Sequence, residues 1–220
     1  MSSPSIPARG RPSRLDRART VQTALDLLNQ SGLDALTMRR LADAMGVQAG
    51  ALYRYFATKQ DLLTAMAERM MDGATDAATA ADDDDWAGQL TALARAMRTA
   101  LLSHRDGARV FAGTHSNGEN TLGFADALVG VLRDAGFPDD DAALALYTVA
   151  NYTVGHTLEE QAARQPGNGG PADPGVLRDA VTAGAYPHLS ATLPTLTGQD
   201  FTRLFEFGLG LLVTGLRARH

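Results

Sequence analysis

The chain of 220 residues contains no cysteine, which excludes disulfide bridges and metal sites built on thiolates. It also lacks a run of about 18 consecutive apolar residues, so we expect no segment that spans a membrane. The first residues, MSSPSIPARGRPSR, contain no apolar stretch of the kind found in secretory signals. These absences together lead us to expect a cytoplasmic protein.

The signatures of an enzyme are missing as well. The sequence shows no phosphate-binding glycine loop and no cluster of metal ligands, so we expect neither a cofactor nor a bound metal. Ser103, His104 and Asp106 are the residue types of a catalytic triad, but they lie too close in sequence to form a convincing one. We interpret the acidic run 82–85 as an exposed loop before the next helix rather than as a metal site.

The formal net charge is −5, which by itself argues against binding to DNA. The charges are, however, unevenly distributed along the chain. Residues 1–70 carry ten Lys and Arg against six Asp and Glu, whereas the rest of the chain carries ten against nineteen. This asymmetry indicates an N-terminal part that faces DNA and a body that does not.

A helix-turn-helix pattern runs from Leu36 to Lys59, LTMRRLADAMGVQAGALYRYFATK. Thr37 is a suitable N-cap for a first helix, and Gly46 follows where a tight turn requires a positive φ. Leu52 is the apolar anchor of a second helix, expected over residues 48–55. Two short helices joined in this way can place the second one in a major groove, so we favour a DNA-binding unit over an ordinary helical hairpin.

The side chains that this unit does not need inside it form the expected contact surface. Arg and Gln bind guanine and adenine edges, and Ala contacts the thymine methyl group. Tyr53 and Lys59 suit contacts with phosphates, which fix the register without reading sequence. Thr58 and Asp61 have capping-box spacing, so a further helix should begin there. The expected DNA-binding residues of this unit are Thr37, Arg39, Arg40, Gln48, Ala49, Gly50, Ala51, Tyr53, Arg54, Tyr55 and Lys59.

Residues 1–14 are rich in Pro, Ser, Gly and Arg and are expected to be disordered on their own. Within them, Arg9-Gly10-Arg11-Pro12 resembles the core of an AT-hook, which inserts arginine into narrow minor grooves. Arg9, Arg11 and Arg14 are therefore expected minor-groove contacts. A passive, solubilising tail is an equally open interpretation of this arm.

The remaining sequence shows helical periodicity, with neither a convincing strand nor an internal repeat. We expect an all-α protein with a three-helix DNA-binding domain over residues 15–70 and a ligand-binding and dimerisation domain over residues 71–220. Loops are expected over residues 114–120 and 165–175 and again after residue 183. Helices are expected over residues 15–31, 59–76, 86–103, 122–135, 139–165, 176–183 and 200–219.

The last expected helix, Asp200 to Arg219, is apolar on more than one face and therefore needs cover on both sides. A homodimer interface formed with the Asp139–Gln165 helix would supply that cover, whereas the alternative is burial within one subunit. Gly208, Gly210 and Gly215 lower the intrinsic stability of the helix but allow another helix to approach closely.

The sequence resembles the TetR family of bacterial repressors in residues 15–70, and its tetracycline-repressor class over nearly the whole chain. The resemblance implies an all-α homodimer whose three-helix head binds a palindromic operator and whose body binds a small molecule that releases the DNA. Family members often control an adjacent efflux pump. The motifs that carry the resemblance are Leu15-Asp16, Ala24-Leu25-Asp26-Leu27-Leu28-Asn29, Leu101-Leu102-Ser103-His104-Arg105-Asp106-Gly107-Ala108, Gly113-Thr114, Thr153-Val154-Gly155, Leu158-Glu159-Glu160-Gln161 and Phe207-Gly208-Leu209.

The chain departs from the tetracycline-repressor pattern where that class binds its drug. The histidine that coordinates the drug-bound magnesium matches Phe111, and a second drug-contacting histidine matches Thr75. Glu159 keeps the carboxylate that holds magnesium through water, but one carboxylate alone binds Mg²⁺ weakly. These departures predict a roomier, more apolar pocket for a different ligand, without magnesium. In the head, Ala49 and Arg54 replace other residue types, so the operator sequence should differ.

The expected pocket combines apolar walls with a few orienting groups. The apolar walls are formed by Phe111, Leu93, Met97 and Leu128. The last three match a drug-binding Asn, Phe and Gln of the tetracycline-repressor class. The orienting groups are Thr114, His115, Asn117, Asn151, Tyr152, His156 and Glu159. The resemblance implies a repressor that a small molecule releases from operator DNA, and the apolar walls predict that this inducer is bulky and largely apolar. The alternative is a ligand-independent regulator or architectural DNA binder with a minor-groove arm, which would have no sizeable pocket.

Overall fold

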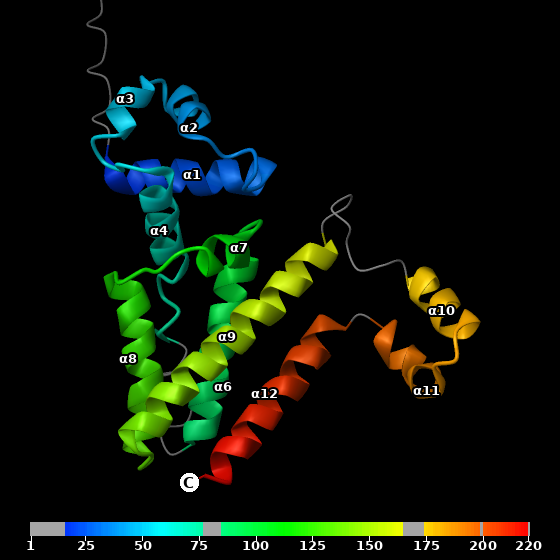
Figure 1. Cartoon of the computed structure of the whole chain (residues 1–220). Helices are drawn as coiled ribbons and strands as arrows, with labels where there is room; N and C mark the ends of the chain where they lie inside the picture. The colour runs from blue at the N-terminus through cyan, green and yellow to red at the C-terminus, as the bar shows by residue number, and fades with distance from the viewer. Residues whose placement is uncertain (1–15, 77–84, 165–173, 199, 220) are drawn as a thin grey trace, which may run out of the picture.

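The computed structural model describes residues 16–76, 85–164, 174–198 and 200–219. The predicted arm with Arg9, Arg11 and Arg14 and most of the acidic run 82–85 lie outside these ranges. All regular secondary structure in the described residues is helical, which confirms the all-α prediction. Figure 1 shows a head of short helices on one end of a longer helical bundle, with a two-helix hairpin at the side. No described helix is long and apolar enough to cross a membrane.

The head is built around one apolar cluster, to which the predicted inward residues Leu41, Ala42 and Leu52 belong. Phe56 and Met66 are also fully buried there. Val110 of the body packs into the same cluster, so the core of the head continues into the body. The helices of the head are α1 (Arg17–Ser31), α2 (Met38–Met45), α3 (Ala49–Leu52) and α4 (Lys59–Met70).

The body has a second apolar cluster between its long helices, with Leu90, Leu93, Leu128, Val149 and Phe205 among its buried side chains. α6 packs along α9, and α8 packs against both. α12 lies along α9 on the outer side of the bundle (Figure 1). The helices of the body are α6 (Trp86–Leu102), α7 (Gly107–Ala112), α8 (Glu119–Asp134), α9 (Asp139–Arg164) and α12 (Phe201–Arg217).

The boundaries of α4 and α8 differ from the predicted ones. α4 ends at Met70 rather than near residue 76, because the chain turns at Gly73, with φ 75°, and brings Met71 into the body core. α8 begins at Glu119 rather than at Leu122. A side chain from α4 caps its first turn, and no local sequence signal could show this.

The segment after residue 183, predicted to be a loop, forms a helix. α10 (Pro174–Ala183) and α11 (Pro187–Leu196) make a hairpin that lies to the side of the bundle in Figure 1. Pro187 is compatible with this helix because it occupies the first helical turn, where its missing N–H is not needed. The hairpin buries little of its own surface, since Val181 is buried in α10 and α11 has no buried residue.

Candidate DNA interface and ligand-binding region

Local hydrogen bonds set the geometry of the helix-turn-helix. The Thr37 hydroxyl accepts the N–H of Arg40 at 3.1 Å, which caps α2 as predicted. Gly46 adopts φ 66° in the left-handed region, and the next residue, Val47, donates its N–H to Ala42 O at 3.0 Å. Leu52 then fixes α3 to the core with no exposed surface. α3 is a single turn, shorter than predicted, because the Leu52 carbonyl accepts the N–H groups of both Tyr55 and Phe56.

The predicted contact residues lie on the outer side of this unit. Tyr53 and Tyr55 expose 51% and 43% of their surface, although both are large aromatic side chains. The half-buried members are Ala49, Ala51 and Lys59; of these, Ala49 and Ala51 were expected to lie outside and do so only in part. Ala49 packs against the core of the head. The exposed members are Thr37, Arg39, Arg40, Gln48, Gly50, Tyr53, Arg54 and Tyr55.

The head is joined to the body at the turn between α6 and α7. Leu33 donates its backbone N–H to the Asp106 carboxylate at 2.8 Å. Asp34 accepts two hydrogen bonds from the Arg109 guanidinium, at 2.8 and 3.1 Å. Nearby, the Asn29 side chain accepts the backbone N–H of Arg105 at 3.0 Å. These contacts tie the C-terminal end of α1, and the loop after it, to one short segment of the body.

The same turn is held from the other side by α9. The Gln161 side chain accepts the N–H of Ala108 at 3.0 Å and donates to the carbonyls of Leu101 and His104, at 3.0 and 2.8 Å. Gln161 is 9% exposed, so these bonds are shielded from water. A continuous set of hydrogen bonds therefore leads from a central body helix to the head.

His104, in this turn, has its pKa lowered by burial, with the charge of Asp26 acting in the opposite direction. The side-chain nitrogen of Asn29 lies 3.3 Å from His104 Nδ1. A neutral imidazole can accept a hydrogen bond at that atom, whereas a protonated ring cannot. The junction therefore suits the uncharged form of His104.

The apolar residues predicted to line a pocket are brought together in the body. Leu93, Met97 and Leu128 are all buried in its core cluster, and Phe111 packs against this cluster and against that of the head. Two cavities are present elsewhere. One, of about 880 Å³, lies between α1, α4 and the start of α8; the other, of about 350 Å³, lies between α9 and α12. Of the predicted ligand residues only Asn117 lines either one.

The predicted polar groups on α9 have different environments. The Tyr152 hydroxyl donates to the carbonyls of Leu204 and Phe205 of α12, at 3.2 and 2.8 Å. His156 Nε2 lies 2.8 Å from the Phe201 carbonyl. Their polar atoms thus hold α12 against α9. Asn151 and Glu159 are exposed on α9, and in the segment before α8, His115 and Asn117 are exposed while Thr114 is half-buried.

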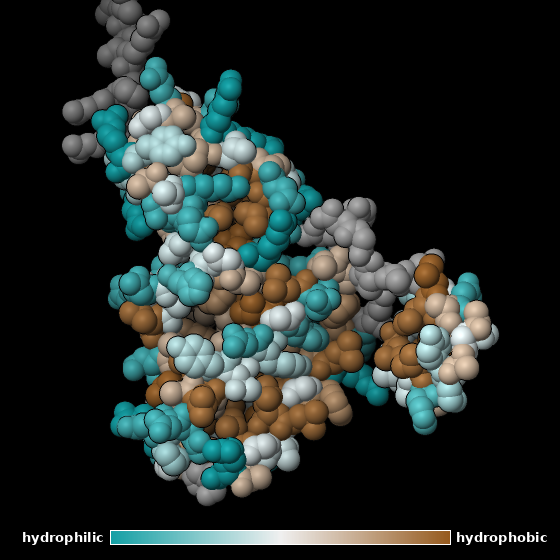
Figure 2. Space-filling model, in the orientation of Figure 1, coloured by the Kyte–Doolittle hydropathy of each residue, from teal (hydrophilic) through white to brown (hydrophobic). Residues whose placement is uncertain are grey.

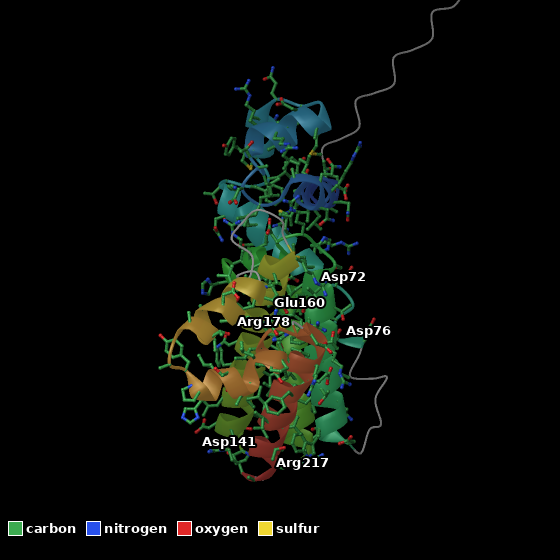
Figure 3. The ribbon with its side chains drawn as sticks, turned by 90° about the vertical axis from the view of Figure 1, so that its right-hand side faces the viewer. Asp72, Asp76, Asp141, Glu160, Arg178 and Arg217 are labelled. Atoms are coloured by element: carbon green, nitrogen blue, oxygen red, sulfur yellow. The ribbon has the colours of Figure 1, made fainter. Side chains whose placement is uncertain are left out.

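The buried carboxylate of α9 is Glu160, which the sequence did not single out. It has no exposed surface and accepts two hydrogen bonds from the Arg98 guanidinium, both at 2.9 Å. The guanidinium carbon of Arg98 lies 5.1 Å from the centre of the Phe205 ring. In Figure 3, Glu160 lies in the part of the body nearest the head, while Asp141 and Arg217 mark its opposite end. A carboxylate near the C-terminal end of a helix is unfavourable without a partner, and this was the signal available in the sequence.

Comparison with known proteins decides the family. Residues 21–66 match the bacterial regulatory proteins of the tetR family, and residues 78–220 match the tetracyclin repressor-like C-terminal domain. The chain is 40% identical over 208 residues to the tetracycline repressor protein class A from transposon 1721 of Escherichia coli, across 94% of this chain and 93% of that protein. The chain belongs to the TetR family.

Solved structures of other TetR-family proteins are similar over nearly all of the chain. A possible TetR family transcriptional regulator from Streptomyces coelicolor A3(2) is 74% identical, with a TM-score of 0.87 over 93% of this chain and 100% of that one. A variant of TetR from Acinetobacter baumannii AYE, in complex with minocycline, is 34% identical, with a TM-score of 0.73 over 93% and 94%. BioQ with its natural double-stranded DNA operator is 32% identical, with a TM-score of 0.67 over 93% and 99%.

The two TetR-family matches correspond to the head and to the body of the structure. The first covers most of α1 and α4 together with all of α2 and α3, and the second includes every described helix from α6 to α12. Members of this family are DNA-binding transcription regulators. The helix-turn-helix is therefore the DNA-binding motif of the chain, as the sequence predicted, whereas the set of residues that contact DNA stays a prediction.

Proposed function

We propose that the chain is a homodimeric repressor that binds a palindromic operator and is released by a small, bulky, largely apolar molecule, and that it controls an efflux or resistance gene. The observation that carries the proposal is the set of hydrogen bonds between the α6–α7 turn, α9 and the head. A change in the packing of the body is transmitted through these bonds to the surface that faces DNA.

Operator binding is assigned to α2 and α3. Residues 15–70 act as the DNA-binding domain, with α3 in the major groove. Gln48 and Arg54 are placed to read base edges, and Tyr53 and Lys59 to contact phosphates. The arm with Arg9, Arg11 and Arg14 reaches an adjacent minor groove. BioQ, a similar structure, is solved with its operator, which supports this assignment.

Dimerisation is assigned to α9 and α12. Phe207 and Leu211 of α12 expose 69% and 59% of their surface, and Leu144 and Tyr147 of α9 expose 63% and 68%. Figure 2 shows apolar side chains gathered on the face of the body. A contiguous apolar surface of this kind marks a protein interface. Gly210 and Gly215 have open space where a Cβ would lie, which leaves room for the second subunit.

The ligand is assigned to residues 71–220, among the apolar side chains Leu93, Met97, Phe111 and Leu128. These side chains are packed together in the present conformation, so the ligand binds by opening this region. A site of this composition accepts a bulky molecule and orients it with a few polar groups. The similar Acinetobacter protein solved with minocycline supports a drug-like compound. We propose binding without magnesium, since the apolar Phe111 stands where the resemblance places the magnesium-coordinating histidine.

Release follows as a shift in population between two conformations of the dimer. The ligand stabilises a body conformation in which the two heads are spaced wrongly for successive major grooves. α4 and the α6–α7 turn carry the change. An operator affinity that stays the same at saturating ligand, for every compound tested, would rule out this mechanism.

The deciding experiment is footprinting of the purified protein on the intergenic DNA upstream of its own gene, with and without drug-like compounds exported by a neighbouring pump. The expected result is a protected palindrome that one compound abolishes. Protection that no compound relieves would instead indicate a ligand-independent regulator. Deletion of residues 1–14 tests the arm, since unchanged operator affinity at fixed salt would make it a passive tail.

A further inference from the structure

Glu68, near the C-terminal end of α4, places its carboxylate against the first turn of α8. It accepts hydrogen bonds from the backbone N–H groups of Asn120 and Thr121, the second at 3.2 Å. It also accepts bonds from the hydroxyl groups of Ser116, at 2.8 Å, and Thr121, at 2.6 Å. In return, the side-chain amide of Asn120 donates to the backbone carbonyl of Glu68 at 3.1 Å. Four hydrogen bonds thus join Glu68 to α8, and a fifth joins it to Ser116 in the segment just before that helix.

α8 has no N-cap side chain of its own. Gly118 occupies the N-cap position and offers no side-chain acceptor. The first N–H groups of a helix lack partners within the helix, and a negative charge beside them is favourable. Glu68 supplies both the acceptor and the charge from a different helix. Burial alone would raise the pKa of Glu68, but its hydrogen bonds outweigh burial and lower the pKa, which keeps the carboxylate ionised.

Gly118 provides independent support for this cap. Its backbone, with φ −77° and ψ 170°, is extended and open to any residue, so conformation does not require glycine. A Cβ at this position would instead lie 2.6 and 2.7 Å from the two carboxylate oxygens of Glu68. Any larger residue at position 118 would therefore have to displace the Glu68 carboxylate from its place beside α8.

We propose that Glu68 couples the DNA-binding head to the body by capping α8 from α4. The proposal rests on the function proposed above and assigns one route of communication to a named residue. α4 belongs to the core of the head through Leu62 and Met66. α8 belongs to the ligand region through Phe124 and Leu128. A movement of α8 must either carry α4 with it or break the cap.

Beside the cavity, hydrogen bonds rather than packed side chains connect α4 to α8. The cavity of about 880 Å³ between head and body is lined by Glu68, Ser116, Gly118 and Asn120. On that side of the cap the two parts are separated by open space rather than by packed side chains. The strength of the cap therefore depends on the position of α4 relative to α8. Operator binding constrains the head, and α4 is part of the head.

The test separates a coupling role from a merely structural one by moving the cap within the chain. Glu68→Ala removes the cap. Glu68→Ala combined with Gly118→Asp restores one from the N-cap position of α8 itself, where the extended backbone suits aspartate and the Glu68 carboxylate no longer fills the space. The recapped variant should regain thermal stability that Glu68→Ala loses. Glu119→Ala removes an exposed carboxylate from the same turn and serves as the matched control.

The readout is hydrogen exchange at the amides of Asn120 and Thr121, in free protein and in protein saturated with the footprinted duplex. In the wild type and in Glu119→Ala we expect operator binding to change the exchange rate by about fivefold or more, as a coupling free energy of the usual size requires. In the recapped variant we expect the rates of the free and bound protein to agree. Linkage is reciprocal, so operator affinity should differ between the recapped variant and the wild type by a similar factor.

Each remaining outcome counts against the coupling. A wild-type protein that binds the duplex with no change in exchange at these amides would overturn it, and so would a recapped variant that keeps the wild-type change. Glu68 would then be a structural cap alone. A wild-type protein that fails to bind the duplex at all is a distinct result, because it would overturn the proposed function and this route with it.

Discussion

The backbone N–H of Leu33, in the head, donates to the carboxylate of Asp106, in the body, at 2.8 Å. Asp106 has φ 56° and is the one non-glycine residue in the left-handed region among those described. A backbone of this kind costs about 1–3 kcal/mol and persists where the surrounding structure holds it. The α6–α7 turn is therefore fixed in a strained conformation by its contacts with head and body, which makes it sensitive to changes in either.

Replacement of Asp106 tests this contact. Asp106→Ala should lower the free energy of unfolding by about 1–3 kcal/mol, because the N–H of Leu33 loses its acceptor near the protein interior. Asp106→Asn keeps a side-chain oxygen, and asparagine tolerates left-handed φ, so it should cost less. Urea unfolding of both variants measures the difference. Equal losses would mean that a neutral side-chain oxygen does not replace the carboxylate, so that the contact depends on its charge.

Stability should fall as the pH is lowered through the range of histidine titration. The folded protein lowers the pKa of His104 below its ordinary value of 6.5, so the unfolded chain takes up a proton first. Stability contributed by the neutral ring is therefore present above about pH 6.5 and decreases below it. Melting temperatures at several pH values measure the effect. His104→Gln should show a weaker decrease over this range, and an identical profile would exclude His104 as its cause.

Arg54 is expected to read a base edge. Arg54→Ala should weaken operator binding by about 1–3 kcal/mol and relax discrimination at one base pair, as loss of a bidentate contact with guanine does. Fluorescence anisotropy at fixed salt, on the operator and on single-base variants, measures both effects. Arg133→Ala, at an exposed arginine of the body, is the control and should leave affinity unchanged. A uniform loss across all sequences would assign Arg54 to a phosphate instead.

The exposed apolar face of α12 is expected to hold the dimer together. Phe207→Glu places a charge at a side chain that is 69% exposed in the single chain, and we expect it to produce monomers. Light scattering coupled to size-exclusion chromatography measures the mass. Leu122→Glu makes the same change at a 55% exposed residue of α8 and should remain dimeric. If both variants are dimeric, the dimer interface does not involve this face of α12.

Tetracycline is expected to bind weakly whether or not Mg²⁺ is added. The position that matches a magnesium-coordinating histidine is Phe111, which packs against both apolar clusters. Glu159, the carboxylate that the resemblance retains, is exposed on α9. Isothermal titration with tetracycline, with and without Mg²⁺, tests the proposal. Micromolar or tighter affinity that requires the metal would contradict it.

The sequence predicted best those features that depend on neighbouring residues. Thr37, Gly46 and the Thr58–Asp61 capping box act within one helical turn, and all three form as expected. Prediction from the sequence failed where a residue far away in the chain determines the local structure. The start of α8 depends on Glu68 of another helix, and the polar atoms of Tyr152 and His156 are used by α12. These contacts follow from the packing of whole helices.

Adjacent residues on α9 show the limit of pattern matching most clearly. Glu159 and Glu160 are chemically identical, and the resemblance singled out the first. Consecutive residues on a helix point about 100° apart, so one of the two faces solvent while the other is buried against Arg98. The orientation of α9 in the bundle decides which is which, and the sequence alone does not specify that orientation.

The hairpin of α10 and α11 bears on how the protein folds. Each of its helices has ten residues, and helices shorter than about 12–15 residues are marginal in water without tertiary packing. Val176 and Tyr186 remain exposed, so one chain gives this hairpin little of the apolar burial that would hold it. If the hairpin becomes helical only when two chains associate, its helix content should increase with protein concentration. Circular dichroism should then show more helical signal per residue in concentrated than in dilute protein. Folding of this segment would then be a late step that follows the meeting of two chains.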